Sequence, residues 1–267
     1  MSVKSFVIAS SAVLLCAACQ PEAGAPAIET APEPPIETAE ASWDKGAMVT
    51  AANPLAAEAG ADVLRRGGSA VDAAIAVHTV LGLVEPQSSG IGGGAFMLVY
   101  DRATGETTVY DGRETAPMAV SETLFVEDGD VLGFMESWQS GKASGVPGAI
   151  ALYKAAHEAH GVMDWASNFD AAIALAENGF EVSPRMHSFV ANERIRAVAR
   201  LDDHPVSAAY FYPDGDPLPI GYLRDNPDYA ETLSRVAAEG IEAFYTGEIA
   251  EAIVIKTGTM FGEAQLA

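Results

Sequence analysis

Four glycines lie among the five residues from Gly90 to Gly94, within the stretch PQSSGIGGGAFMLVY. An apolar pattern of helical length precedes this glycine run, and an apolar strand pattern follows it. A dinucleotide-binding G-x-G-x-x-G/A loop needs the reverse order, because the phosphates bind at the N-terminus of the helix that follows the strand. The order of elements therefore argues against a dinucleotide site. Close packing remains as the explanation, since glycine lets the backbone approach neighbouring layers and adopt φ values that other residues avoid.

Three other motif-like stretches lack what their chemistry requires. Ser88 and Ser89 could be nucleophiles, but no G-x-S-x-G turn is present and no base lies nearby, so we interpret them as loop residues. The stretch SGKAS lacks the first glycine and the Mg²⁺-binding Ser/Thr of a Walker loop. The stretch HEAH has the residue types of a zinc protease motif without its histidine spacing. None of the three predicts a catalyst.

Two helices are predicted ahead of the glycine run. Asn53 caps the first, with Pro54 at its first position, and a glycine ends it. Ser69 caps the second, with Asp72 three residues later as a short capping box. The body of the second helix, AAIAVHTVLGLV, is apolar nearly all round and is predicted to be buried. We interpret His78 within it as a hydrogen-bonded core histidine rather than a ligand.

Two strands are predicted after the glycine run, AFMLVYD and ETTVYDGR, joined by a turn as a β-hairpin. We expect the first strand to be buried on both faces. Helical patterns follow over AIALYKAAHEAHG, FDAAIALAENG, a stretch from Ser183-Pro184 to about Arg200, DYAETLSRVAAEG and GEIAEAIVIKTG, with a turn-rich FYPDGDPL between them. A hairpin followed by a long helical tract predicts an α+β fold.

The composition excludes several classes of function. The formal net charge is −22 and no Lys/Arg cluster offsets it, so the surface repels phosphate backbones and nucleic acid is excluded as a partner. Both cysteines, Cys16 and Cys19, lie near the N-terminus, so the rest of the chain has no thiol nucleophile and no cysteine metal site. The five histidines are scattered. We predict neither a metal nor a cofactor.

The N-terminal residues have the pattern of a targeting segment. Residues 1–19 combine Lys4 with a short apolar run, which is typical of a signal peptide rather than a membrane-spanning helix. The ending LCAAC indicates the lipoprotein type with Cys19 lipidated, and cleavage by ordinary signal peptidase after Ala18 is the alternative. Residues 20–42 are rich in Pro, Ala and Glu and predict a disordered tether. We expect an exported protein of the periplasm or cell envelope, with its domain over 43–267.

The stretch Asp111-Gly112-Arg113-Glu114 contains a candidate anion site. An arginine at the end of a strand, beside a glycine, can present its planar guanidinium to a carboxylate in two parallel hydrogen bonds. Alternatively, Arg113 forms a surface pair with Glu114 or Asp111. The residues alone do not decide between these interpretations.

Five stretches together resemble the large subunit of γ-glutamyltranspeptidases. They are MVTAANPLAAEAGADVLRRGGSAVDAAIAV, PQSSGIGGGAFMLVY, DGRETAP, SGVPG and AFYTGEIAEAI, in the family's order and at similar spacings. The resemblance covers about Met48 to Ile253. It implies a partial αββα sandwich of the N-terminal nucleophile hydrolase type, with residues 43–267 forming a truncated large-subunit part.

The resemblance also implies a chemistry. In that family a precursor cleaves itself, and the new N-terminal threonine of the small subunit attacks the γ-glutamyl amide of glutathione and related compounds, with its own amine as base. The acyl group then passes to water or to an amino acid. The arginine that holds the α-carboxylate of the γ-glutamyl group falls on Arg113. Gly92, Gly93 and Gly94 would form the floor of the site.

The family's catalytic threonine, its oxyanion hole and the acid that holds the substrate's α-amine belong to a second half that this chain does not match. We therefore expect no catalytic residue within the 267 residues, no activity of the chain alone, and the missing small-subunit half as its partner. A related amidase, such as a cephalosporin acylase or a poly-γ-glutamate-processing enzyme, is one alternative. A tethered lipoprotein that binds small anions without catalysis is the other.

Overall fold

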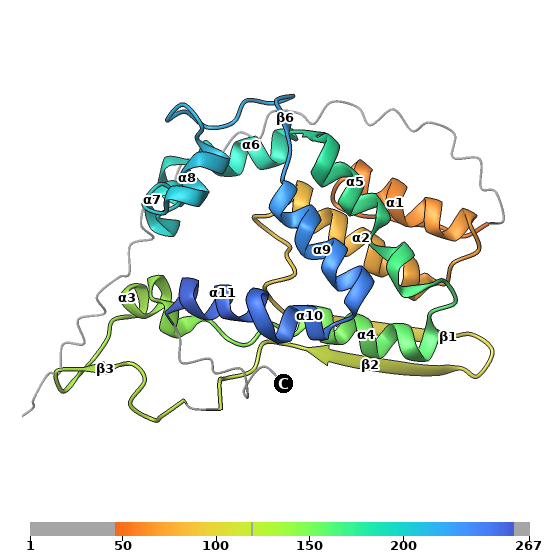
Figure 1. Cartoon of the computed structure of the whole chain (residues 1–267), viewed down its shortest axis with the longest axis horizontal. Coiled ribbons are helices and arrows are strands. Elements are labelled where there is room, and N and C mark those ends of the chain that lie inside the picture. Colours follow the sequence, from red (N-terminus) through yellow and green to blue (C-terminus); the bar gives the residue numbers. More distant parts are fainter. Residues whose placement is uncertain (1–45, 119, 259–267) are drawn as a thin grey trace, which may run out of the picture. The chain divides into compact units, whose positions relative to one another are not determined.

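The computed structural model describes residues 46–118 and 120–258 (Figure 1). The predictions for the signal peptide, for Cys19 and for the tether over residues 20–42 lie outside these ranges. Within them the chain is a mixture of helices and short antiparallel sheets. No helix of the described residues is long and apolar enough to cross a membrane.

The helices and strands have the following bounds. The helices are α1 Pro54–Arg65, α2 Ala70–Val84, α3 Phe134–Gln139, α4 Ala149–His160, α5 Asp170–Asn178, α6 Pro184–Val190, α7 Glu193–Ala199, α8 Pro205–Phe211, α9 Pro227–Glu239, α10 Glu242–Tyr245 and α11 Gly247–Thr257, with 3-10 turns η1 Gly141–Ala143 and η2 Trp165–Asn168. The strands are β1 Ala95–Asp101, β2 Glu106–Gly112, β3 Val126–Glu127, β4 Asp130–Val131, β5 Phe180–Glu181 and β6 Leu223–Arg224.

The first two helices begin where their capping residues predict. The Asn53 side chain accepts a hydrogen bond from the Leu55 N–H, with Pro54 following as the first helical residue. Ser69 and Asp72 form a complete capping box, in which each side chain accepts from the other residue's backbone N–H. These bonds satisfy N–H groups that have no partner within the helix. Both predicted helix starts are confirmed.

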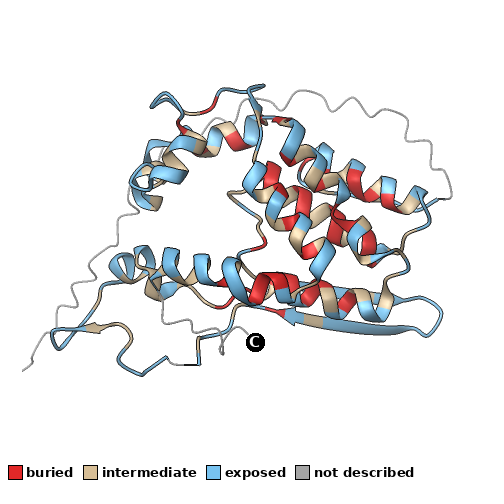
Figure 2. Ribbon diagram, in the orientation of Figure 1, coloured by how far each residue is buried: buried red, intermediate tan, exposed pale blue. Residues whose placement is uncertain are grey.

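Helix α2 lies at the centre of the packed helices. It contacts α1, α4 and α5, and nine of its fifteen residues are buried, as the buried positions in Figure 2 illustrate. Ile75, Val80 and Leu83 are at most 2% exposed and belong to one continuous apolar cluster with residues of α4, α5 and α9. The predicted burial of this helix is confirmed, because an all-round apolar helix needs neighbours on every side.

Strands β1 and β2 form the predicted hairpin, paired in register from Ala95 opposite Gly112 to Asp101 opposite Glu106. The prediction that β1 is buried on both faces is wrong. Its side chains alternate, and Phe96, Leu98 and Tyr100 are 59–69% exposed in the described structure. The opposite face packs near α4. A short apolar run does not distinguish a strand covered on both faces from one covered on a single face.

The helical pattern from Ser183 to Arg200 forms two helices rather than one. Helix α6 ends at Val190, and the Asn192 side chain accepts from the N–H groups of Arg194 and Ile195 to begin α7. A local side-chain cap competes with continuation of the preceding helix, which the apolar pattern alone does not reveal. Helix α8, which leads into the turn-rich FYPDGDPL stretch, was not predicted from the sequence.

Candidate functional site

Residues of the glycine run, the SGVPG stretch and the AFYTG stretch meet at the start of α4. The Gly93 carbonyl accepts hydrogen bonds from the N–H groups of Gly148 and Ala149, at 3.0 and 3.1 Å. The Tyr245 hydroxyl donates to the Pro147 carbonyl at 2.7 Å and accepts from the Ala151 N–H at 3.1 Å. Segments about a hundred and fifty residues apart in sequence are thus fixed to the same first turn of α4.

Gly94 lies in direct contact with the backbone that carries Arg113. A Cβ on Gly94 would come within 2.6 Å of the Gly112 carbonyl oxygen and 2.9 Å of the Arg113 Cα. The Gly112 carbonyl oxygen likewise occupies the position that a side chain on Gly148 would need. Only glycine permits this approach, which brings the two stretches together.

The other glycines of the run differ from Gly94. A Cβ on Gly93 would meet the end of the Glu114 side chain at 3.2 Å, and one on Gly92 would meet nothing within 4 Å. None of the glycines of the run has a positive φ. Close packing therefore explains Gly94, whereas the expectation of φ values closed to other residues is wrong for this run.

Arg113 follows β2 directly, and two carboxylates orient it. Its backbone N–H donates to Asp111 Oδ1 at 2.9 Å. Its Nε lies 3.1 Å from Glu114 Oε2, while Glu114 Oε1 accepts from the Gly94 N–H at 2.6 Å. Glu114 therefore links the guanidinium to the glycine run. The Arg113–Glu114 pair that the sequence left as an alternative does form, and it occupies only one edge of the guanidinium.

The terminal nitrogens of Arg113 remain open. Among residues 46–118 and 120–258 neither Nη1 nor Nη2 has a hydrogen-bond partner, and the side chain is 72% exposed. Two parallel N–H donors match the two oxygens of a carboxylate. A guanidinium held at Nε and open at both Nη atoms can thus bind a carboxylate end-on, so an anion site is compatible with the pair to Glu114.

A cavity of about 590 Å³ lies beside this arginine, and we refer to it as the Arg113 cavity. Its lining consists of Gly92, residues 113–117, Val120, Leu124, Phe125 and residues 142–145. The two longer segments are joined by paired hydrogen bonds between Thr115 and Val146, at 3.3 and 2.8 Å. The volume is typical of a site for a small organic ligand.

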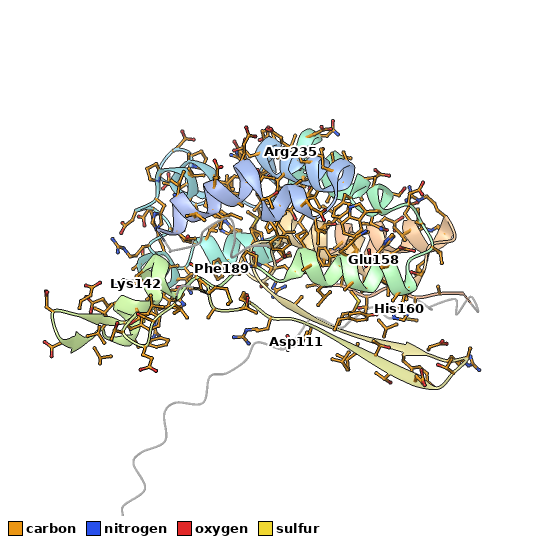
Figure 3. The ribbon with its side chains drawn as sticks, turned by 60° about the horizontal axis from the view of Figure 1, so that its bottom comes forward. Asp111, Lys142, Glu158, His160, Phe189 and Arg235 are labelled. Carbon is orange, nitrogen blue, oxygen red and sulfur yellow. The ribbon has the colours of Figure 1, made fainter. Side chains whose placement is uncertain are left out.

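A second cation, Lys142, lines the same cavity from η1. Its Nζ pairs with Glu127 of β3, and its side chain is 33% exposed. Figure 3 shows Lys142 in the segment that carries α3 and β3, and Asp111 near the end of β2. In the sequence, Lys142 stands out only within a stretch that lacks parts of a Walker loop, because nothing local indicates that it shares a cavity with Arg113.

Glu85 is a buried carboxylate that the sequence analysis missed. It is 1% exposed at the end of α2 and accepts hydrogen bonds from Asn53 Nδ2 at 2.9 Å, from the Ser183 hydroxyl at 3.0 Å and from Gln87 Nε2. These donors come from the caps of α1 and α6 and from the stretch that leads into the glycine run. A buried carboxylate needs such partners, and Glu85 fixes where the run begins. Its one signal in the sequence is a charge at the end of an apolar helix.

His78 has the structural role expected of it. Its Nδ1 hydrogen-bonds the buried Tyr153 hydroxyl, and burial lowers the pKa of its imidazole below the ordinary value of 6.5. Burial of this kind disfavours the protonated imidazole. Within the part of the chain that the structure describes, no group of three or more His, Cys, Asp or Glu side chains is arranged to hold a metal ion.

Comparisons with known proteins relate the chain to one family. The family model for gamma-glutamyltranspeptidase matches residues 56–263. Glutathione hydrolase proenzyme of Bacillus subtilis (strain 168) is 37% identical over 212 residues, which cover 78% of this chain and 35% of that protein. The crystal structure of Helicobacter pylori gamma-glutamyltranspeptidase superimposes with a TM-score of 0.76 at 33% identity, covering 84% of this chain and 64% of that one.

One solved structure with a different printed activity is also similar. Cephalosporin acylase from Bacillus halodurans superimposes with a TM-score of 0.69 at 31% identity, covering 80% of this chain and 40% of that chain. The chain spans about a third of the length of the Bacillus subtilis relative, at 35%. Because the family model covers most of its residues, the chain belongs to the gamma-glutamyltranspeptidase family, of which it matches the N-terminal portion.

Proposed function

We propose that this chain forms the N-terminal part of an exported γ-glutamyltransferase or glutathione hydrolase. The complete enzyme cleaves γ-glutamyl amide bonds and passes the acyl group to water or to an amino acid. The nucleophilic threonine comes from the family's second half, which these residues do not match. Support comes from the family model over residues 56–263 and from relatives named glutathione hydrolase.

The observation that carries the proposal is the geometry of Arg113. Glu114 holds its Nε at 3.1 Å, and both Nη atoms lack a partner among the described residues, on a side chain that lines the Arg113 cavity. In the proposed reaction these donors bind the α-carboxylate of the γ-glutamyl group. The scissile γ-amide is then held at a constant distance from this anchor, where an incoming nucleophile can reach it. Positioning of this kind contributes to rate through orientation rather than through bond chemistry.

The exposed face of the hairpin supports a partial αββα sandwich. Phe96, Leu98 and Tyr100 of β1 lie on one face with Val109 of β2, and all four are at least 59% exposed. Contiguous exposed apolar side chains on a sheet mark a surface that another element covers. In the proposal, the catalytic half covers this face. A Leu98→Lys variant should fold normally, because the residue is 69% exposed, yet fail to assemble with the catalytic half.

The similarity to a cephalosporin acylase supports a second candidate, an amidase of the same superfamily with another acyl group. Arg113 favours an acyl group with a carboxylate near the scissile bond, which both candidates allow. Comparing kcat/KM for a γ-glutamyl anilide with that for a glutaryl anilide separates them. The two acyl groups differ only in the α-amine, and the proposed function requires a preference for the γ-glutamyl compound.

The test of Arg113 uses the complete enzyme, with this chain and its catalytic half. Arg113→Ala should raise KM for a γ-glutamyl substrate by about 10- to 150-fold, the loss of roughly 1.5–3 kcal/mol from a charged hydrogen bond. Arg113→Lys should recover only part of this, since lysine offers no paired donors. Arg102→Ala, in the turn between β1 and β2, is the matched control. An unchanged KM for Arg113→Ala would refute the assignment.

The remaining parts of the proposal have separate tests. The purified 267-residue chain should not hydrolyse a γ-glutamyl anilide, and measurable hydrolysis would show that the chain contains its own catalyst. Export with lipidation of Cys19 should give a mature N-terminus whose mass includes the lipid. Cleavage after Ala18 with an unmodified cysteine would instead support the ordinary signal peptidase.

A further inference from the structure

The Arg113 cavity is lined by more positive than negative side chains, although the chain as a whole is acidic. The whole chain has a net charge of −22, yet the charged residues that line this cavity are Arg113, Lys142 and Glu114. Glu114 is already bound to the Gly94 N–H and to Arg113 Nε. Among the described residues, two cations thus line this cavity together with a single carboxylate, and Lys142 is held by Glu127, which lies outside the lining. Such a cavity favours a ligand with more than one negative group.

Packing holds the backbone at Lys142 in place. Gly141 lies against α11, and the Thr257 carbonyl oxygen occupies the space that a side chain at Gly141 would need. On the other side, the Thr115–Val146 hydrogen bonds join the segment after Lys142 to the segment after Arg113. The two cations thus extend from neighbouring segments that are fixed to each other. Because the backbones are fixed, the two side chains can select a ligand by the spacing of its charges once Lys142 exchanges Glu127 for the ligand.

We propose that Lys142 is a specificity residue that binds a carboxylate on the leaving side of the scissile amide. The inference rests on the proposed function, in which Arg113 binds the carboxylate on the γ-glutamyl side. Glutathione has both groups, since its glycine ends in a carboxylate. A cavity of about 590 Å³ is in the range of sites that bind small organic ligands of this size. Lys142 moves from Glu127 to the substrate when the carboxylate enters.

The experiment compares two substrates with the same scissile bond. The complete enzyme is assayed on glutathione and on glutathione whose glycine carboxylate is converted to the amide. The KM of the wild type should be about fivefold lower for glutathione than for the amide, which is near the most that a partly exposed ion pair contributes. We refer to the KM for the amide divided by the KM for glutathione as the KM ratio. In Lys142→Met this ratio should fall to about one, and in Lys142→Arg it should persist. Glu127→Gln should increase the ratio, because the lysine loses its competing partner.

Lys154→Met is the matched control. Lys154 has a similar side-chain exposure, 37% against 33%, and a similar pairing, with Glu158 at 3.2 Å, but it lies on α4 outside the cavity lining. Its removal should leave the ratio at the wild-type value. If Lys142→Met retains the full ratio, or raises KM equally for both substrates, Lys142 does not recognise the leaving-side carboxylate. A wild type that hydrolyses neither substrate would instead refute the proposed function.

Discussion

Gly94→Ala should destabilise the fold and displace the backbone of Arg113. The added methyl group would lie 2.6 Å from the Gly112 carbonyl oxygen, 2.9 Å from the Arg113 Cα and 2.9 Å from the Glu114 nitrogen. All three are backbone atoms, so no side chain can rotate away to make room. Ordinary contact begins at 3.4 Å, and the Gly112 oxygen would have to move by about 0.8 Å.

The expected loss follows from this overlap. Inserting a methyl group into a packed region costs about 1–3 kcal/mol, and three rigid contacts favour the upper half of that range. For a chain of this size, roughly 1 kcal/mol corresponds to 2–4 °C in Tm. We therefore expect the Tm of Gly94→Ala to fall by about 4–12 °C. Because the moved atoms belong to residues 112–114, KM for a γ-glutamyl substrate should also rise in the complete enzyme.

Gly92→Ala is the matched control, with the same chemical change two residues earlier. A Cβ there meets nothing within 4 Å, and Gly92 has no positive φ. Replacing a glycine in an allowed conformation reduces the freedom of the unfolded chain and stabilises by about 0.4–1 kcal/mol. The two variants should therefore shift Tm in opposite directions when unfolding is followed by far-UV circular dichroism. Equal shifts, or a Gly94→Ala variant that melts with the wild type, would refute the packing argument.

Three further variants probe other contacts. Tyr245→Phe removes the hydroxyl bonded to Pro147 and Ala151 and should lower the free energy of unfolding by about 1–3 kcal/mol in urea denaturation; an unchanged midpoint would contradict this. Glu85→Ala leaves the buried Asn53 amide and the partly buried Ser183 and Gln87 donors without an acceptor and should destabilise by about 3 kcal/mol or more, whereas exposed Glu58→Ala should change stability by less than about 0.5 kcal/mol. Burial lowers the pKa of His78, so the unfolded state binds more protons below pH 6.5 and stability should fall as the pH drops through that value. In His78→Gln this part of the pH dependence should be weaker, and an identical slope would show that another group titrates.

Asp72 is a second group expected to make the fold less stable at low pH. Burial by itself raises the pKa of this carboxyl, but N–H groups of Val162, Ser69 and Met163 and the Ser69 hydroxyl outweigh it and leave the pKa below 3.8. A carboxyl with a lowered pKa stabilises the fold above its unfolded value and loses that contribution as the pH falls through the folded one. Asp72→Asn should therefore reduce the loss of stability below about pH 4.

Local sequence signals were sufficient to predict where the helices with strong N-terminal caps begin. Asn53 and the Ser69–Asp72 capping box each satisfy N–H groups within a few residues, so the sequence predicts where α1 and α2 start. The same kind of signal was present at Asn192, but an apolar pattern that continued across it favoured one helix over two. The β1–β2 hairpin was predictable from its turn, whereas the exposure of one face of β1 depends on what packs against it.

The sequence by itself determined the family, the hairpin, the main helices and the choice of Arg113 as the candidate anion-binding residue, because motif order and capping are properties of the chain. Only the tertiary structure decided how Arg113 is held. Its partner Glu114 acts through the N–H of Gly94, twenty residues away, and Lys142 reaches the same cavity from a segment joined at Thr115. Tertiary contacts also showed that Gly94 is tightly packed and Gly92 is not, although both belong to the same glycine run. The physical reason is that close approach of backbones and sharing of a cavity arise between segments distant in sequence.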